Sequence, residues 1–171
     1  RAKDFASILI GFGILFVGMT TMETTLAPLK DSEQFQRIFF LFKNPLLGVA
    51  VGALITAILQ SSSASVGVLQ AISSTGTVTF SMEAPIIMGQ NIGKCVTVLI
   101  ASIGTSKKAK RAVYIDLIVN MLGAAFFLIV VYGYQALVGF PFWDDVVNRG
   151  NIADFHSLFN IVTCVLVFPF T

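Results

Sequence analysis

The chain has 171 residues, of which 56% are hydrophobic and only 12% are charged. A soluble domain of this size carries about 25% charged residues, so the composition excludes an ordinary cytosolic globule and a disordered tail. Eleven basic and nine acidic residues give a net charge of +2, which is too small for a nucleic-acid binder. Two cysteines and one histidine are too few for a disulfide framework or a His/Cys metal site. The composition therefore predicts an all-α integral membrane protein.

Long uncharged stretches predict where the chain crosses the membrane. Residues 44–82 contain no Asp, Glu, Lys or Arg, and residues 112–143 contain only Asp116. Apolar runs of about 18 or more residues are typical of membrane-crossing helices. In chain order we predict a span over 5–27, an interfacial helix over 30–43, an unusual segment over 44–82, and spans over 84–103, 113–137 and 155–170.

The unusual segment is too short to cross the membrane before it turns polar. Its apolar part, residues 44–59, would rise about 24 Å as a helix, less than the roughly 30 Å hydrocarbon core. The polar run QSSSAS at 60–65 would therefore lie deep in the membrane, where it must face protein or a wet cavity. Two structures fit this pattern: a re-entrant helical hairpin with the polar run at its tip, or two full spans with a serine-rich kink.

A second polar cluster interrupts the span predicted over 84–103. The sequence GQNIGK at 89–94 is followed one turn later by Thr97. Two glycines and an asparagine weaken a helix, so we predict a broken helix here. Together the two polar segments predict a site near the membrane midplane, lined by hydroxyls, amides and helix ends.

Two titratable residues each precede an asparagine by four positions. Asp116 stands in this relation to Asn120, and His156 to Asn160. The spacing places both members of each pair on one helix face. Such faces either line a site or, more often, hold helices together by interhelical hydrogen bonds. The serines lack the glycine pattern of a nucleophile elbow, so we predict no enzyme.

The basic residues predict the orientation in the membrane. Four positive charges within residues 105–111 make this loop cytoplasmic by the positive-inside rule. Counting the crossings then places both termini in the cytoplasm, for a multi-pass protein of the plasma membrane. The loop over 139–151 lies outside and holds Phe140, Phe142 and Trp143, which are residue types of the head-group level.

Three motifs resemble those of one transporter family. QSSS at 60–63, GQNIG at 89–93 and HSLFN at 156–160 resemble the type II sodium-dependent phosphate cotransporters and their bacterial relatives. That family consists of two inverted repeats, each with a QSSS hairpin and a GxNIG segment, and substrate binds between the hairpin tips. This chain contains one of each and is most similar to the second repeat. We therefore expect residues 1–171 to be a single transmembrane domain, one half of an inverted-repeat transporter, without the first repeat or a PhoU-like cytoplasmic domain.

The resemblance implies sodium-coupled transport of inorganic phosphate, with no cofactor besides the coupling sodium ion. The residues expected to bind phosphate are Ser61, Ser62, Ser63, Gly89 and Asn91. The residues expected to bind sodium, the only metal we expect, are Gln60, Ser65, Gln90 and Thr97. Helix N-termini and hydroxyls can replace the hydration shell of phosphate, and amide oxygens suit a hard cation. Besides phosphate, sodium and the bilayer, the expected partner is a second repeat or a second copy of the chain.

Two positions depart from the family pattern. Lys94 stands where the family usually has threonine, and Asp116 where it usually has histidine. An ammonium group at Lys94 would take the place of a bound cation, which favours a second hypothesis: a non-transporting membrane scaffold or sensor, or an isolated repeat that needs a partner chain. A lysine inside the bilayer needs compensation, and Asp116 is the only acid in the two neighbouring spans. We predict a Lys94–Asp116 ion pair; the alternative is that Lys94 extends into a wet cavity and Asp116 meets the basic loop.

Overall fold

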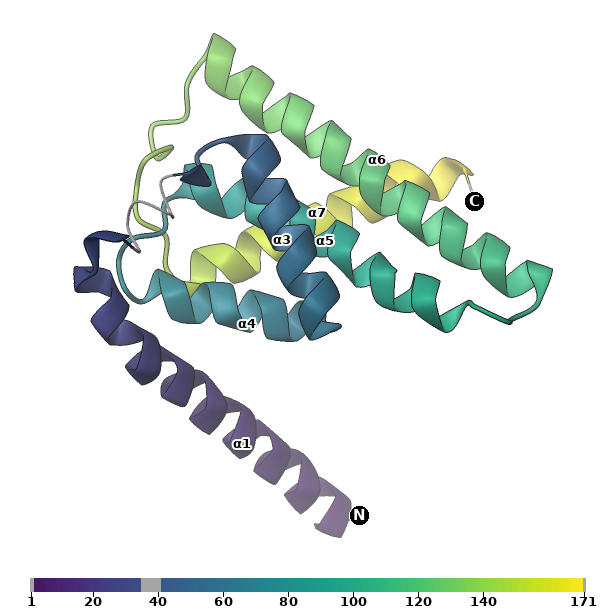
Figure 1. Cartoon of the computed structure of the whole chain (residues 1–171), viewed down its shortest axis with the longest axis horizontal. Coiled ribbons are helices and arrows are strands. Elements are labelled where there is room, and N and C mark those ends of the chain that lie inside the picture. The colour runs from purple at the N-terminus through teal and green to yellow at the C-terminus, as the bar shows by residue number, and fades with distance from the viewer. Residues whose placement is uncertain (1, 35–40, 171) are drawn as a thin grey trace.

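The computed structural model describes residues 2–34 and 41–170, and helices dominate this part of the chain. In chain order the helices are α1 (Ala2–Leu26), η1 (Ala27–Asp31), α3 (Pro45–Leu59), α4 (Ser62–Ser73), α5 (Phe80–Ala101), α6 (Lys107–Leu137), α7 (Arg149–Val167) and η2 (Phe168–Phe170), as Figure 1 shows. The described residues form no strand and only one isolated β-bridge, between Thr79 and Val146. The all-α prediction is confirmed. The interfacial helix predicted over 30–43 falls largely on residues 35–40, outside the described residues.

Four of the described helices are long and apolar enough to cross a membrane, namely α1, α5, α6 and α7. They coincide with the four predicted spans, although all four begin earlier than predicted, α6 and α7 by six residues each. Ser106 begins α6 by accepting the Ala109 N–H at 3.3 Å. Asn148 and Asn151 begin α7 with a reciprocal capping box, in which each side chain accepts the backbone N–H of the other. These caps extend both helices beyond their apolar windows into polar sequence.

Helices α3 and α4 are the two arms of the unusual segment. At 15 and 12 residues they are about 22 and 18 Å long, so neither reaches across a hydrocarbon core of about 30 Å. Gln60 ends α3 in the left-handed conformation, with φ of 55°. Ser61 then begins α4 by accepting the Ala64 N–H at 3.2 Å. The tip of the hairpin is therefore only Gln60 and Ser61, and Ser62 to Ser65 already belong to the first turn of α4.

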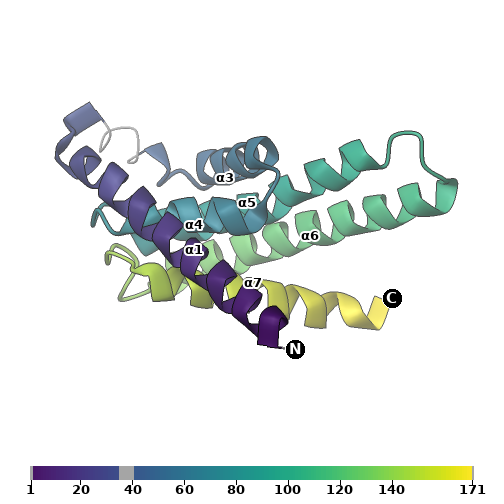
Figure 2. The same ribbon diagram turned by 90° about the horizontal axis from the view of Figure 1, so that it is seen from below.

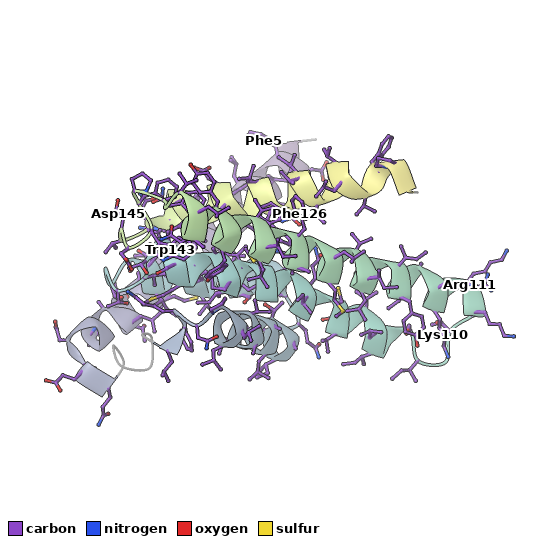
Figure 3. The ribbon with its side chains drawn as sticks, turned by 90° about the horizontal axis from the view of Figure 1, so that it is seen from above. Phe5, Lys110, Arg111, Phe126, Trp143 and Asp145 are labelled. Carbon is purple, nitrogen blue, oxygen red and sulfur yellow. The ribbon has the colours of Figure 1, made fainter. Side chains whose placement is uncertain are left out.

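Both ends of this hairpin lie at the same end of the molecule. Lys43, just before α3, forms an ion pair of 2.8 Å with Asp144 in the loop between α6 and α7. Val78, shortly after α4, accepts the Val147 N–H of the same loop at 2.9 Å. The start of α6, where Lys110 and Arg111 lie, is at the opposite end (Figure 3). The chain thus enters α3 and leaves α4 at one end of the bundle.

Helix α3 packs along α5 through glycines spaced four residues apart on each helix: Gly48, Gly52, Gly89 and Gly93. A Cβ atom added at Gly52 would overlap the carbonyl oxygen of Ile86, and one added at Gly89 would overlap that of Val49. The two backbones are therefore in direct contact, as at the small-residue interfaces of membrane helices.

The helix break predicted at residues 89–94 is wrong, because α5 runs without interruption from Phe80 to Ala101. Its glycines serve the contact with α3 and do not open the helix. Asn91 reinforces the helix locally, since its Nδ2 donates to the Ile87 carbonyl at 3.0 Å. Pro85 removes one helical donor near the start, and the Tyr132 hydroxyl donates to the orphaned Ser81 carbonyl at 3.4 Å.

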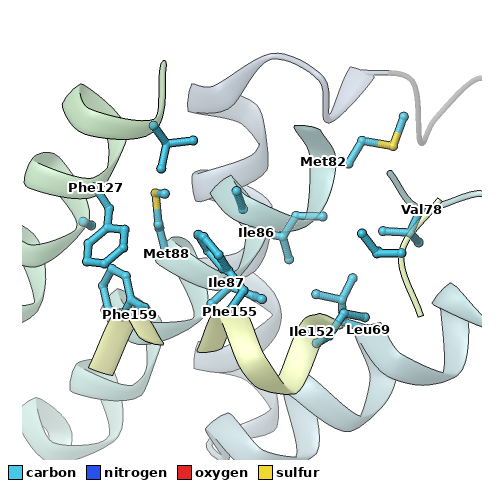
Figure 4. Close-up of a cluster of buried hydrophobic side chains, with 14 residues drawn as sticks. Leu69, Val78, Met82, Ile86, Ile87, Met88, Phe127, Ile152, Phe155 and Phe159 are labelled. Atoms are coloured by element: carbon cyan, nitrogen blue, oxygen red, sulfur yellow. The ribbon is translucent and has the colours of Figure 1, made fainter. Parts of the chain in front are cut away.

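A hydrophobic core fills the space between α5, α6 and α7 (Figure 4). Phe127 of α6 and Phe159 of α7 lie with ring centroids 4.8 Å apart, and Ile87 of α5 and Ile152 of α7 are fully buried. The core residues labelled in Figure 4 come from every helix of the bundle except α1 and α3. This core orients α5, the helix that carries the second polar motif.

Helix α1 projects away from this bundle in Figure 1 and crosses in front of it in Figure 2. None of its span is buried within the described part of the chain, and it contacts mainly α4. Glu23 near its C-terminal end forms an ion pair of 2.8 Å with Arg149 at the start of α7. An apolar helix exposed along its length is suited to contact with lipid or with further protein in the membrane.

Replacing Gly89 by alanine should destabilise the protein, because the added methyl group forces α3 away from α5. Overpacking of this kind costs about 1–3 kcal/mol. Gly133→Ala in α6 is the matched control, since a Cβ there meets nothing within 4 Å. Alanine at that position should stabilise the helix by about 0.5–1 kcal/mol. Thermal unfolding in detergent measures both variants, and equal effects would contradict the packing role of Gly89.

Candidate functional site

Three buried polar side chains meet where α3, α4 and α5 converge. Thr56 Oγ1 donates to Ser65 Oγ at 2.8 Å, and Gln90 Nε2 donates to the Ser65 carbonyl at 3.1 Å. Their exposed fractions are only 0%, 1% and 2%. The absence of a side chain at Gly93 allows α3 to approach α5 closely here, because a Cβ at this position would lie only 2.8 Å from the Thr56 Cβ. We refer to Thr56, Ser65 and Gln90 as the three-helix junction.

Buried oxygens without partners lie along the same face of α5 as Gln90. Among the described residues, Gln90 Oε1 and Thr97 Oγ1 have no hydrogen-bond partner, and neither does either carboxylate oxygen of Glu83, which is fully buried. These three residues are seven positions apart, so they lie on one face of the helix. Buried polar atoms are normally satisfied, so this row calls for an ion or water. Acceptor oxygens in a row are suited to a cation.

The serines of the hairpin tip lie nearer the surface than the junction. Ser61 and Ser63 are exposed, Ser62 is half-buried, and Gln60 at the turn is exposed. The N–H groups of Ser62 and Ser63 precede the first intrahelical bond of α4, which begins when Ser65 N–H donates to the Ser61 carbonyl at 3.0 Å. Free N–H groups and hydroxyls at a helix N-terminus are suited to bind an anion.

The other two residues predicted to bind phosphate, Gly89 and Asn91, are buried and make contacts within the protein. Gly89 is buried against α3, as described above. Asn91 has only 1% of its surface exposed, and its Oδ1 accepts the Lys94 ammonium at 3.2 Å. The structure therefore separates the predicted set into exposed serines at the tip and buried groups on α5.

Lys94 and Asp116 do not form the predicted ion pair. Asp116 instead accepts the Cys95 thiol at 3.3 Å and the Asn120 amide at 3.1 Å. Within the described part of the chain no acid lies within ion-pair distance of Lys94, whose partner is Asn91. The reason is rotational: Cys95 is the residue of α5 that meets Asp116, and Lys94 lies about 100° around the helix from it.

The two repeated pairs on α6 and α7 have the same local geometry. Asn120 Nδ2 donates to the Asp116 carbonyl at 2.8 Å, and Asn160 Nδ2 donates to the His156 carbonyl, also at 2.8 Å. Each asparagine also approaches the side chain of its partner, at 3.1 Å for Asp116 and 3.3 Å for His156. The prediction that each pair shares one helix face is confirmed. These bonds stay within each helix, and the Asn120 side chain also interacts with Cys95 of α5, so the expected interhelical contact is present for Asn120.

Three residues at or near the site were not predicted from the sequence: Thr56, Glu83 and Cys95. Thr56 is the only polar side chain of α3 and stands one turn before Gln60, which is a usable signal. Glu83 is the only charged residue between Lys43 and Lys94, and its place just before a predicted span is a second signal. Nothing in the sequence distinguishes Cys95 from an ordinary apolar residue.

Thr56→Val should destabilise the protein by about 0.5–1.5 kcal/mol, because it removes the hydrogen bond to Ser65 without changing the side-chain shape. Thr163→Val is the matched control on α7. The Thr163 hydroxyl is buried and has no partner in the part of the chain that the structure describes, so its removal should be neutral or stabilising. Chemical or thermal unfolding of the two variants tests this contrast. A neutral Thr56→Val would show that the junction contributes nothing to stability.

Comparisons with known proteins agree with the motifs. YqeW of Bacillus subtilis is 28% identical over 172 residues, which cover 99% of this chain and 54% of YqeW. Human sodium-dependent phosphate transport protein 2B is 33% identical over 111 residues, which cover 61% of this chain and 16% of that protein. YjbB of Escherichia coli K12, whose description proposes inorganic phosphate export, is 23% identical over 171 residues, 99% of this chain and 31% of YjbB.

The chain thus spans about half the length of YqeW and smaller shares of the other two relatives. No solved structure matches it. A family model described as Na+/Pi-cotransporter matches residues 14–142, which include the QSSS and GQNIG motifs. This match covers most of the sequence, and the chain therefore belongs to the Na+/Pi-cotransporter family.

Proposed function

We propose that the chain takes part in moving inorganic phosphate across the membrane, coupled to sodium ions. Membership of the Na+/Pi-cotransporter family supports phosphate as the substrate. The observation that carries the proposal is the three-helix junction, where within the described residues the buried Gln90 Oε1 has no partner and lies one turn of α4 from the tip of a helical hairpin. An apolar bundle gains nothing from such oxygens unless a ligand or water satisfies them.

Phosphate binds, in this proposal, at the N-terminal end of α4. Ser62 and Ser63 offer free N–H groups and hydroxyls there, and the helix dipole favours an anion. No acidic residue lies in α3 or α4 to repel phosphate. Gly89 and Asn91, buried within the contacts of α5, act by placing the neighbouring Gln90 and not by touching phosphate in this conformation.

Sodium binds at the junction itself. Gln90 Oε1 provides an unpaired amide oxygen, and Ser65 adds its hydroxyl and carbonyl oxygens within hydrogen-bond reach of the Gln90 side chain. Glu83 and Thr97 extend the row of unpaired oxygens to either side of Gln90. A cation at the junction would lie within one helical turn of the α4 N-terminus, which places the two opposite charges close enough to stabilise one another.

Gln90→Met should abolish the sodium dependence of phosphate uptake, because methionine keeps the volume but removes the amide oxygen. An interaction with a charged ligand is worth about 1.5–3 kcal/mol, so sodium affinity should fall at least about tenfold. Gln70→Met is the matched control, since Gln70 donates to the Arg149 carbonyl away from the junction. Uptake of radiolabelled phosphate into vesicles under sodium or potassium gradients measures both. Unchanged sodium dependence in Gln90→Met would contradict the proposal.

A non-transporting scaffold or sensor is the second candidate, and Lys94 favours it. Its ammonium already donates a hydrogen bond to Oδ1 of Asn91, the residue next to Gln90. A resident ammonium would satisfy part of the site without a sodium ion. Phosphate binding that persists in the absence of sodium, with no uptake in the same vesicles, would favour this candidate over transport.

The hairpin of α3 and α4 is, we propose, re-entrant and opens to the outside of the plasma membrane. Its two ends lie together with the loop between α6 and α7, opposite the start of α6, where Lys110 and Arg111 lie (Figure 3). The positive-inside rule then places the basic loop and both termini in the cytoplasm. A second repeat or a second copy would complete the bundle on its exposed faces.

Cysteines introduced at Lys43 and Ser74 should both react with a membrane-impermeant thiol reagent applied from outside. Both positions are exposed and flank the hairpin. A cysteine at Lys108, in the basic segment, should react only from the cytoplasmic side. The background is Cys164→Ser, because Cys164 is exposed whereas Cys95 is buried. Labelling of positions 43 and 74 from opposite sides would show that the segment crosses the membrane.

A further inference from the structure

A cavity of about 820 Å³ lies between α6 and α7, beneath the loop that joins them. It is separate from the three-helix junction and shares no residue with it. Its inner wall is apolar and includes Phe127 and Val131 of α6 and Phe155 of α7. Val130 and Leu158 form its outer edge, with 47% and 52% of their surfaces exposed. The cavity therefore opens on the side of the bundle that would face lipid.

Aromatic rings line the end of this cavity nearest the loop. Phe80 packs edge-on against Phe142 and Phe155, with ring centroids 5.1 and 5.4 Å apart. Phe140 lies 5.2 Å from Phe142 and lines the same end. The faces of aromatic rings attract organic ammonium groups, most strongly where water is partly excluded.

Two carboxylates lie at the rim beside these rings. Asp145 and Asp154 line the cavity and are exposed, and within the described residues neither side chain has a hydrogen bond or an ion pair. The basic side chains nearby are engaged elsewhere, since Lys43 pairs with Asp144 and Arg149 pairs with Glu23, each at 2.8 Å. The rim therefore carries two uncompensated negative charges next to aromatic rings. This arrangement is complementary to a cation.

The level of the cavity in the membrane follows from the same loop. Trp143 and Asp145 lie at the end of the bundle opposite the basic residues Lys110 and Arg111 (Figure 3). Aromatic residues gather at the head-group level of a bilayer. An occupant would thus place its polar head at the rim and its hydrocarbon part along α6 and α7.

We propose that this cavity binds one membrane phospholipid whose head group carries an ammonium group. The ammonium lies between Asp145 and Asp154 and against the rings of Phe140 and Phe142. One acyl chain lies along Val130, Val131 and Leu158. A lipid of the same chain length with an anionic head group is disfavoured, because the two carboxylates repel it and provide it with no donor.

The single tryptophan of the chain provides the test, since Trp143 stacks on Phe140 with an interplanar angle of 9° and ring centroids 6.0 Å apart. The protein is reconstituted into vesicles that contain lipids with brominated chains, which quench nearby tryptophan. Brominated phosphatidylethanolamine should quench Trp143 about twofold more strongly than brominated phosphatidylglycerol, as expected for exposed charge pairs. The double variant Asp145→Asn/Asp154→Asn should lose this preference. Asp31→Asn, an exposed acid of η1 outside the cavity lining, should keep it, and it leaves the Lys43–Asp144 ion pair intact.

Three results would overturn the proposal. Equal quenching by the two lipids in the unchanged chain would show that the cavity does not select an ammonium head group. Loss of the preference in Asp31→Asn as much as in the double variant would assign it to general surface charge. Relief of quenching by soluble tetramethylammonium would assign the site to a small soluble ammonium compound in place of a lipid. None of these results depends on phosphate transport, so they are independent of the proposed function.

Discussion

The direct contact between the backbones of α3 and α5 is the constraint on which the candidate site depends. Glycines on both helices remove the side chains that would otherwise separate them, and α3 therefore has one position and one rotation against α5. That rotation points Thr56 at Ser65 and brings the start of α4 over Gln90. The junction is consequently held by helix packing and two hydrogen bonds, without a charged residue, which leaves Gln90 Oε1 available to a ligand.

The sequence was sufficient for the fold class and for the positions of the spans, because both follow from where charges are absent. The arms of the hairpin were also predictable: Asn44 and Pro45 are typical of a helix start, and the QSSS run ends the apolar stretch. The starts of α6 and α7 were predicted too late, because hydropathy marks the apolar window and the caps at Ser106 and Asn148 lie outside it. Helix termini depend on local hydrogen bonds that hydropathy does not record.

The candidate site was predicted less completely, because it depends on how each helix is rotated about its axis and on which residues of other helices lie opposite it. The sequence GQNIG looks the same whether its glycines break a helix or provide a surface for a second helix to pack against. The backbone of α3 at Val49 and Ala53 lies against these glycines, so they serve packing. Lys94 and Asp116 have compatible depths along their helices, yet Cys95 is the residue that faces Asp116. By contrast, the pairing of Asn120 with Asp116 and of Asn160 with His156 required only the four-residue spacing, and that spacing alone was enough.

The short length of α3 has a consequence for the order in which the protein is assembled. A helix of 15 residues cannot hold both its ends at the two faces of a bilayer, and α4 is shorter still. The surface that α3 packs against belongs to α5, which is synthesised later. The longer helices can therefore enter the membrane as they emerge, whereas the hairpin reaches its final depth only once α5 is in place. Biogenesis is then a two-step process, in which the region proposed to bind ions forms last.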